Sequence, residues 1–424
     1  MAKIEALAKD KAEKEPEMPL RSKKYIFFIV IFMGLVGLMD QYLSMIEMVV
    51  VDKTYLLGDF GLTAAEFAFW QGIYGVITFG VFFIAWFADA FGRKKGILLL
   101  ILIMGIAAIL IPLTTTAANG FHWFMILYSI IILGTLSNMW EIPVMEESPA
   151  RKRATYGGIA FLIGLIPLYA VLGPIIARTL GWRWCYGIMF FMMIPLILLW
   201  FFMKDPERWK QAHAQRDHKM LKIKTALKSL SRKDLIYIIS ASLVYGLWTI
   251  SYKIALTWAG YFFKDVRGIP VATWNTWLLI GALCVMLGAI SSGILMDKLG
   301  RRPTLAIACI GAVIGYVGLG ITSLQYFFWM IYFFMPIVLA WIMVYFSEIF
   351  PTEVRGTCIG VTTTAARAGY VIGPLTAFVL LTAFPTMEGF WIIAGLFMII
   401  PLFSLLLKPY ETKGQTLEQI QKGR

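Results

Sequence analysis

Three ionisable residues, Asp40, Lys253 and Arg367, lie inside long apolar stretches of the sequence. A charged side chain is costly in hydrocarbon, so such residues usually face a water-filled cavity or pair with one another. A permanently charged guanidinium in that setting needs an anionic partner, and its forked donors suit a carboxylate. Arg367 therefore predicts a site that binds an anion.

Asp40 is the residue that we expect to take up a proton, because a carboxyl group removed from water favours its neutral form. Asp40, Ser44 and Glu47 share one helix face, since positions 40 and 47 nearly eclipse and position 44 lies about 40° away. We expect this face to line a cavity, with Glu47 as a second proton-coupling candidate nearer the outer rim. The alternatives are a permanently paired carboxylate at Asp40 and simple solvation at Glu47.

Polar and aromatic neighbours of the two cations extend the predicted site. Substrate contacts are expected from six residues: Arg367, Lys253, Tyr370, Tyr245, Trp248 and Ser44. Two alternatives stay open. Arg367 could form an internal salt bridge with Asp40. Lys253 could extend its ammonium group toward the membrane surface and take no part in substrate binding.

The composition indicates that these residues lie in a membrane. The chain has 424 residues, of which 59% are hydrophobic and 15% charged, and its mean hydropathy is +0.76. Soluble domains are nearer 45–50% apolar and about 25% charged. The chain is therefore expected to be a multi-pass membrane protein.

A membrane-spanning helix needs about 20 mostly apolar residues, and the sequence contains twelve such segments. They are 25–50, 67–88, 96–117, 121–145, 155–178, 183–203, 234–262, 272–296, 303–323, 326–347, 357–382 and 388–407. The predicted fold is all-α, with twelve transmembrane helices in two pseudo-symmetric six-helix bundles. The predicted organisation is a tail at 1–24, bundles at 25–203 and 234–407, a linker at 204–233 and a second tail at 408–424.

Lysine and arginine are distributed as the positive-inside rule requires if both termini are cytoplasmic. The two tails, the linker and the loops on that side hold 31 of the 38 Lys and Arg residues. This placement explains the net charge of +13, so we expect no nucleic-acid partner. The predicted location is the cytoplasmic membrane. The N-terminal tail lacks the apolar core of a cleaved signal peptide, and the stretch 221–230 could form a helix on the inner leaflet.

The two bundles repeat short loop motifs. Asp89-Ala-Phe-Gly92-Arg93 returns as Asp297-Lys-Leu-Gly300-Arg301, each time between two apolar segments. A second pair of loops reads E-x-x-P-x-x-x-R and consists of Glu146 to Arg153 and Glu348 to Arg355. Two matching halves of a membrane bundle indicate a transporter.

With these paired loops the chain resembles the major facilitator superfamily, in particular its sugar-porter, metabolite:proton symporter and organic-ion branches. The ending Pro409-Tyr-Glu-Thr-Lys-Gly414 is similar to the tail of sugar porters, with Tyr410 inserted. The resemblance implies that the loop charges form a cytoplasmic gate, which braces the outward-facing state and separates as the inside opens. The gate residues would be Asp89, Gly92, Arg93, Glu146, Arg153, Asp297, Gly300, Arg301, Glu348 and Arg355.

Departures from the sugar-porter pattern favour an anion as substrate. The seventh segment lacks the paired glutamines through which that branch binds hexoses. Ile130 stands where many proton-coupled relatives have Arg, and this departure counts against proton symport. Ala85 replaces a glycine of the first motif. Arg367 occupies a position similar to the basic site in the eleventh helix of organic-anion carriers.

We therefore predict a secondary transporter that moves a small organic anion by alternating access, coupled to protons. An anion exchanger and a carrier of a neutral sugar or polyol are the alternatives. A membrane receptor would usually carry a larger signalling extension, and an enzyme would show a catalytic constellation within the spans, which is not visible. The four cysteines and three histidines show no metal-binding spacing. We expect a monomer in the lipid bilayer, without a cofactor, whose partners are its substrate and protons.

Overall fold

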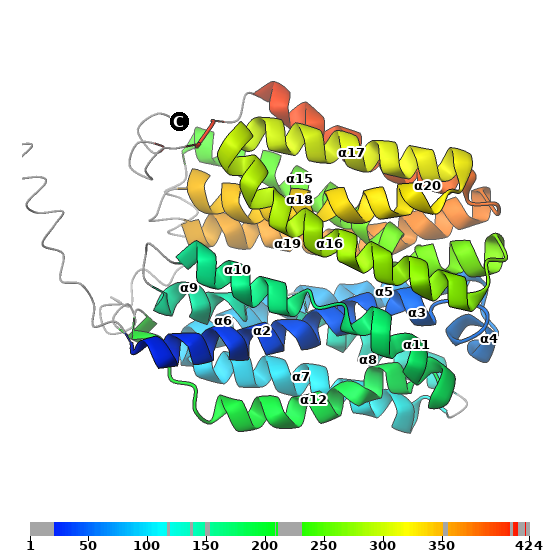
Figure 1. Ribbon diagram of the computed structural model, residues 1–424, viewed down its shortest axis with the longest axis horizontal. Helices are drawn as coiled ribbons and strands as arrows, with labels where there is room; N and C mark the ends of the chain where they lie inside the picture. The colour runs from blue at the N-terminus through cyan, green and yellow to red at the C-terminus, as the bar shows by residue number, and fades with distance from the viewer. Residues whose placement is uncertain are drawn as a thin grey trace, which may run out of the picture.

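The computed structural model describes residues 21–116, 119–135, 139–148, 153–207, 209–210, 231–350, 355–407, 410–413 and 420. In these residues the chain is helical (Figure 1). The first half comprises α2 (Lys23–Met45), α3 (Glu47–Val50), α4 (Leu56–Phe60), α5 (Ala64–Tyr74), η1 (Gly75–Gly80), α6 (Val81–Phe91), α7 (Arg93–Thr114), α8 (Gly120–Thr135), α9 (Glu141–Glu147), α10 (Arg153–Gly164), α11 (Leu168–Thr179) and α12 (Trp184–Trp200).

The second half comprises α15 (Arg232–Tyr261), η3 (Phe262–Val266), α16 (Val271–Leu299), α17 (Arg301–Thr322), α18 (Gln325–Ile349), α19 (Arg355–Ala383), α20 (Glu388–Phe403) and η4 (Ser404–Leu407). Within the described residues, nine helices are long and apolar enough to cross a membrane, and three shorter apolar helices are Gly120–Thr135, Trp184–Trp200 and Glu388–Phe403. Together they occupy the twelve predicted segments. The stretch 221–230, expected to lie on the inner leaflet, is outside the described residues.

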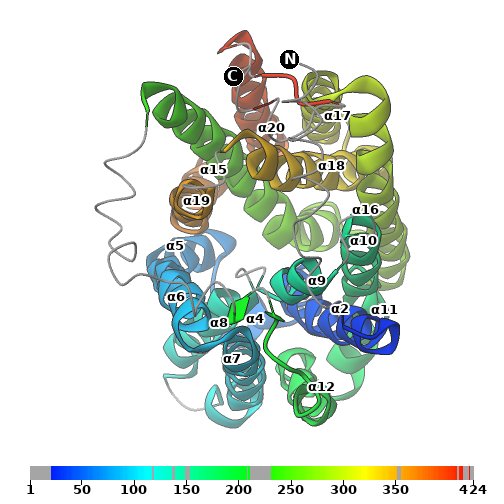
Figure 2. The same ribbon diagram turned by 90° about the vertical axis from the view of Figure 1, so that its left-hand side faces the viewer.

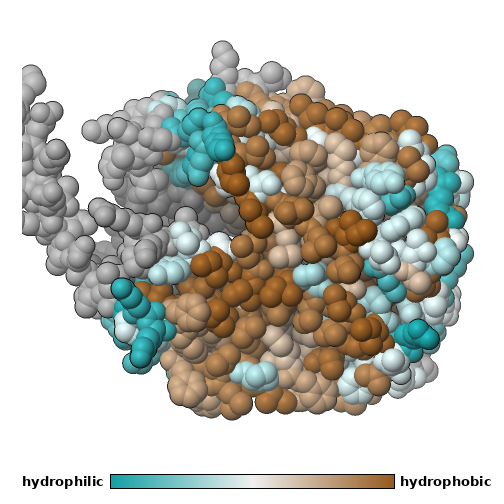
Figure 3. Space-filling view, viewed as in Figure 1, coloured by the Kyte–Doolittle hydropathy of each residue, from teal (hydrophilic) through white to brown (hydrophobic). Residues whose placement is uncertain are grey.

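The two halves lie side by side with their helices roughly parallel (Figure 1). In the view along the helices, α5 of the first half packs beside α19 of the second, and α11 packs beside α16 (Figure 2). Large apolar side chains such as Phe83, Leu198 and Ile239 are exposed on the outside. On the face seen in Figure 3, apolar surface lies between two more polar ends, as expected of a surface that contacts lipid.

Local sequence signals explain where several helices begin and end. Ser231 and Asp234 form a reciprocal capping box at the start of α15, and Thr63 and Glu66 form another before α5. Pro167 separates α10 from α11, because proline has no N–H to continue the helical ladder. The first membrane segment changes at Ile46, where α2 gives way to α3.

We name the two ends of the bundle by their loops. The basic end carries the turns at Gly92 and Gly300, and the far end carries the turns around Gly61, Gly268 and Ser323. Gly92 has a φ of 114° and Gly300 a φ of 101°. Residues other than glycine rarely adopt these angles, so both repeated loops use glycine to make a tight turn.

Candidate functional site

A cavity lies between the two halves, in the middle of the bundle. Its walls come from α2, α8 and α10 of the first half and from α15, α16, α18 and α19 of the second. The cavity is lined by all six residues predicted to contact substrate, namely Ser44, Tyr245, Trp248, Lys253, Arg367 and Tyr370. Asp40 lines it as well. The structure therefore brings together side chains that are far apart in sequence, from Asp40 to Tyr370.

Arg367 of α19 is buried in this cavity wall, with 2% of its surface exposed. Its Nε has no hydrogen-bond acceptor, and Arg367 forms no ion pair, within the described part of the chain. The guanidinium carbon lies 5.8 Å from the centre of the Tyr370 ring. The salt bridge to Asp40, one of the alternatives from the sequence, is not formed. The guanidinium is thus available to a ligand in the cavity.

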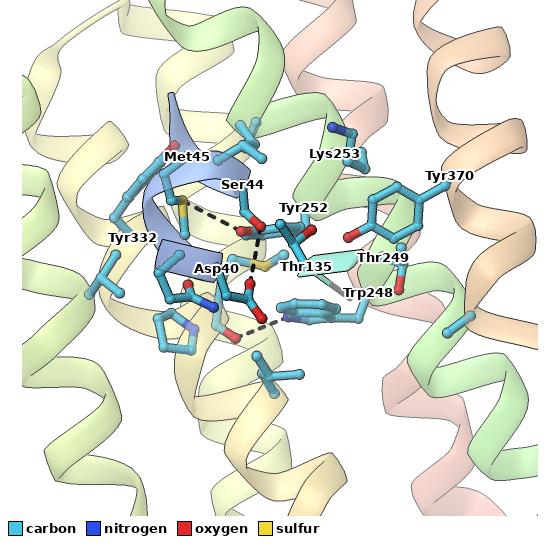
Figure 4. A pocket seen from close by; sticks show the side chains of 18 of the residues that line it. Asp40, Ser44, Met45, Thr135, Trp248, Thr249, Tyr252, Lys253, Tyr332 and Tyr370 are labelled. Atoms are coloured by element: carbon cyan, nitrogen blue, oxygen red, sulfur yellow. Dashed lines mark hydrogen bonds between the residues drawn. The ribbon is translucent and has the colours of Figure 1, made fainter. Parts of the chain in front are cut away.

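Asp40 of α2 is also buried, at 1% exposure. The Trp140 indole N–H donates to Asp40 Oδ2 at 3.2 Å, and the Ser44 hydroxyl donates to Asp40 Oδ1 at 3.4 Å. In Figure 4 Asp40 and Ser44 point toward Trp248 and Tyr252 of α15. Both donors to this carboxyl group are neutral, and no cation forms an ion pair with it among the described residues.

Glu47 does not share the environment of Asp40, although the sequence placed both on one face. Glu47 is fully buried and is not among the residues that line the cavity, so both the expected cavity-lining position and the alternative of simple solvation are wrong. A role of Glu47 in proton coupling stays a prediction. Lys253 Nζ lies 2.6 Å from Glu47 Oε1. The shared face was predicted for a single uninterrupted helix. In the structure α2 ends and α3 begins at Ile46, between Asp40 and Glu47, so the two side chains need not point the same way.

The Glu47 carboxylate is surrounded by donors from both halves. Tyr128 and Gln71 of the first half donate to it, as do Lys253 and Thr257 of α15. Lys253 Nζ also lies 3.1 Å from the Tyr128 hydroxyl and 5.5 Å from the centre of the Tyr370 ring. Lys253 therefore does not extend to the membrane surface. Instead it joins the two halves while one side of it faces the cavity.

A second buried ion pair joins the halves nearer the far end. Lys264 of η3 contacts the Asp52 carboxylate and donates to the Val49 carbonyl oxygen at 3.0 Å. The Lys53 backbone N–H donates to Asp265 Oδ2 at 2.9 Å. A Cβ on Gly260 would lie 2.3 Å from the Met48 carbonyl oxygen, so α15 and the first segment are in close backbone contact. These contacts close the far end.

The described ion pairs at the basic end lie within each half. Arg93 contacts Glu146 at 3.2 Å, and Arg301 contacts Glu348 at 2.7 Å, so the two repeated motifs form matching pairs. Asp297 lies 3.7 Å from Arg301 in the same turn. Three further gate candidates, Asp89, Arg153 and Arg355, have side chains outside the described residues.

Carboxylates from the segments that follow α12 and α20 cap the two repeated turns. Asp205 accepts the Lys94 backbone N–H at 2.8 Å, and Glu411 accepts the N–H groups of Arg301 and Arg302 at 2.9 and 3.0 Å. Both carboxylates therefore bind the N-terminus of a helix, where the backbone donors have no partner within the helix. Burial raises the pKa of Glu411, but hydrogen bonds from the backbone of Arg301, Arg302 and Lys413 outweigh it and lower the pKa.

Sequence reasoning did not assign several cavity and closure residues. Tyr252 and Tyr332 line the cavity, Trp140 binds Asp40, and Tyr128 and Thr257 bind Glu47. Tyrosine, tryptophan and threonine are also common in lipid belts and in helix packing. Their type alone therefore does not distinguish a cavity position from a structural one.

Several known proteins are similar to this chain. It is 25% identical to the cis,cis-muconate transport protein of Acinetobacter baylyi over 75% of this chain and 79% of that protein. It is 27% identical to the putative metabolite transport protein YwtG of Bacillus subtilis over 79% of this chain and 81% of that protein. A glucose transporter, GlcP of Staphylococcus epidermidis, is 24% identical over 79% of this chain and 83% of that protein.

Solved structures share the fold. The proton:xylose symporter XylE bound to 6-bromo-6-deoxy-D-glucose aligns with a TM-score of 0.73 and 19% identity, over 95% of this chain and 99% of that one. XylE from E. coli in an inward-open conformation aligns with a TM-score of 0.69. The sequence pattern of the Major Facilitator Superfamily matches residues 30–374. Taken with the duplicated loops and the paired six-helix halves, this match shows that the chain belongs to the Major Facilitator Superfamily of secondary transporters.

Proposed function

We propose that this transporter carries a small organic anion of the carboxylate type together with a proton, by alternating access across the cytoplasmic membrane. The basic end is cytoplasmic in this proposal, in agreement with the positive-inside distribution of lysine and arginine. One observation carries the choice of substrate: Arg367 is buried in the cavity wall, and its Nε has no acceptor within the described part of the chain.

A carboxylate at Arg367 supplies the missing acceptor. A buried charge without a partner costs several kcal/mol, and a carboxylate can accept two parallel hydrogen bonds from the guanidinium fork. No described residue accepts a hydrogen bond from Arg367 Nε, and a carboxylate bound there would do so. A neutral hydroxyl ligand would accept a hydrogen bond but would leave the charge unbalanced.

Asp40 provides a place for the proton in the same cavity. Its two neighbours, Trp140 and Ser44, donate hydrogen bonds but carry no charge. When the carboxyl group takes up a proton, it no longer offsets the positive charge of Arg367, and the cavity attracts an anion more strongly. Binding of the proton and of the anion therefore favour each other.

Alternating access in this proposal opens one end of the cavity while the other is closed. The Glu47–Lys253 and Asp52–Lys264 pairs hold the far end shut. Their separation would let the halves rock apart there, and a substrate-filled cavity would move with them. Lys253 belongs to the closure and also lines the cavity, so a bound anion acts on the closure directly.

A neutral sugar is the second candidate, because GlcP is named a glucose transporter and XylE a xylose symporter. A thermal-shift screen separates the two. We expect carboxylates to raise the melting temperature of the purified protein and neutral sugars to leave it unchanged, and we expect the shift to disappear in Arg367→Ala. Sugars that stabilise the wild type and Arg367→Ala equally would overturn the proposal.

A further inference from the structure

The cavity contains only one cation that the described neighbours leave unbalanced. Its lining includes two basic residues, Lys253 and Arg367. Lys253 is neutralised by Glu47 at 2.6 Å, with 3% and 1% of the two side chains exposed. Arg367 has no such partner within the described residues. A ligand therefore meets one free positive charge.

Asp40 is the one acidic residue among the described residues that line the cavity. Protonated, it is neutral, and the site then carries a single net positive charge. Ionised, it cancels Arg367, and the site has no net charge to offer an anion. When Asp40 is protonated, a ligand with one negative charge therefore neutralises the cavity.

The remaining walls are mostly apolar. They include Ile132, Phe161, Leu165, Val285, Ile331 and Met335, and the neutral polar groups among them belong to Gln41, Ser44, Thr135, Thr249 and four tyrosines. Trp248 and Tyr252 stack on each other with ring centres 4.8 Å apart and planes 10° apart. The Trp248 N–H is already bonded to the Met335 carbonyl oxygen at 3.0 Å, so the indole offers its ring and not its donor. These walls suit an apolar body.

We propose that the substrate is a monocarboxylate with an apolar body, and that a dicarboxylate is excluded by the lack of a second free cation. This inference rests on the proposed function. The carboxylate binds Arg367 beside Tyr370, and the apolar body lies against Trp248 and the aliphatic wall. A second carboxylate on that body would be buried without a cation. The free-energy cost of burying this unpaired charge exceeds the free energy gained from the apolar contacts.

Binding to matched acids tests this charge count. The probes are benzoate against terephthalate and cyclohexanecarboxylate against cyclohexane-1,4-dicarboxylate, titrated calorimetrically into the purified full-length protein. We expect each monoacid to bind at least tenfold more tightly than its diacid. Benzamide, which has the shape of benzoate without its charge, should bind at least tenfold more weakly. Equal or tighter binding of the diacids would overturn the inference.

Transport in proteoliposomes gives an independent readout. One proton moving with one monoanion transfers no net charge, so benzoate uptake should be insensitive to a membrane potential set with potassium and valinomycin. A dianion moving with one proton would transfer one negative charge, and its uptake would respond to the potential. Voltage-dependent benzoate uptake would contradict the charge count.

Replacing Glu47 by glutamine, which keeps its shape but removes its negative charge, offers the sharpest test. Glu47→Gln leaves Lys253 without its counter-ion, and the cavity then has two free cations near the Tyr370 ring. We expect the ratio of monoacid to diacid affinity to fall at least fivefold. The matched control is Asp52→Asn, which also breaks a buried pair between the halves but at Lys264, which does not line the cavity. It should leave the ratio unchanged.

The two proposals fail in different ways. If diacids bind as well as monoacids and both depend on Arg367, the anion transporter stands and the restriction to monocarboxylates is wrong. If neither kind of acid binds and a neutral sugar does, the proposed function itself is wrong. If Glu47→Gln left the ratio of monoacid to diacid affinity unchanged, the pairing of Lys253 with Glu47 would not be the reason that the wild type excludes diacids.

Discussion

At the scale of single residues, the function depends on what surrounds each ionisable group. Lys253 and Arg367 are both basic residues in the second half, and both line the cavity. One has a carboxylate at 2.6 Å, whereas the other has a buried Nε without an acceptor in the described residues. The first therefore contributes to the structure of the closed state, and the second is available to a ligand.

Replacing Arg367 by lysine tests whether the forked geometry matters as well as the charge. Lysine keeps the positive charge but cannot make two parallel hydrogen bonds to one carboxylate. Losing one charged hydrogen bond costs about 1.5–3 kcal/mol, so we expect carboxylate affinity to fall roughly ten- to a hundredfold. Calorimetric titration measures it. An unchanged carboxylate affinity in Arg367→Lys would mean that the guanidinium does not form two parallel hydrogen bonds to the anion.

Replacing Asp40 by asparagine separates binding from coupling. Asparagine keeps a hydrogen-bonding group beside Trp140 and Ser44 but cannot carry a proton. We expect Asp40→Asn to exchange internal for external substrate while losing accumulation driven by a pH gradient. Counterflow and gradient-driven uptake in the same proteoliposomes measure the two activities. Accumulation at the wild-type level would remove Asp40 from the coupling mechanism.

At the scale of elements, four of the described ion pairs form two groups with different roles. Those at the basic end, Arg93–Glu146 and Arg301–Glu348, hold helices together within a half. Those toward the far end, Glu47–Lys253 and Asp52–Lys264, hold the halves to each other. Breaking the first group should loosen a half, and breaking the second should change which end of the cavity is open.

The far-end closure can be tested by spin labels on Leu180 and Tyr326, which are 57% and 62% exposed in different halves. The native cysteines are replaced first. Removing one partner of a buried pair costs about 3–5 kcal/mol, so Asp52→Asn should shift the equilibrium away from the closed far end. We expect a second, longer distance in pulsed electron resonance. A distance distribution identical to that of the parent protein would show that this pair does not hold the closure.

The contact between Glu411 and the start of α17 has a predictable pH dependence. The pKa of Glu411 is lowered in the folded protein, so its stabilising effect is complete above the ordinary pKa of a glutamate and is lost as the pH falls through the lower value. Glu411→Gln should lower the melting temperature by a few degrees at pH 7 but have little effect near pH 3. An equal deficit at both pH values would contradict an ionised carboxylate at this turn.

At the scale of the whole molecule, the sequence predicted the elements better than it predicted their contacts. Hydropathy and the placement of lysine and arginine located the twelve segments, because a bilayer imposes span length and loop charge directly. The same cost of charge in hydrocarbon identified Asp40 and Arg367 as residues facing a cavity.

The pairing of Glu47 with Lys253 could not be predicted in this way. The two residues are 206 positions apart in different halves, and no local pattern specifies the register between those halves. Packing decides it, through close contacts such as Gly260 against Met48. The same limit applies to Trp140, which directly precedes α9, and to Tyr128 of α8, whose roles depend on how each side chain packs against a carboxylate from a distant part of the chain.

The central claim is that one anion on Arg367 and one proton on Asp40 occupy the cavity together. The most direct test is uptake of radiolabelled benzoate into proteoliposomes with an imposed inward proton gradient, for the wild type, Arg367→Ala and Asp40→Asn. We predict gradient-driven accumulation only in the wild type, residual exchange in Asp40→Asn and neither activity in Arg367→Ala. Accumulation by Arg367→Ala at the wild-type rate would contradict the account.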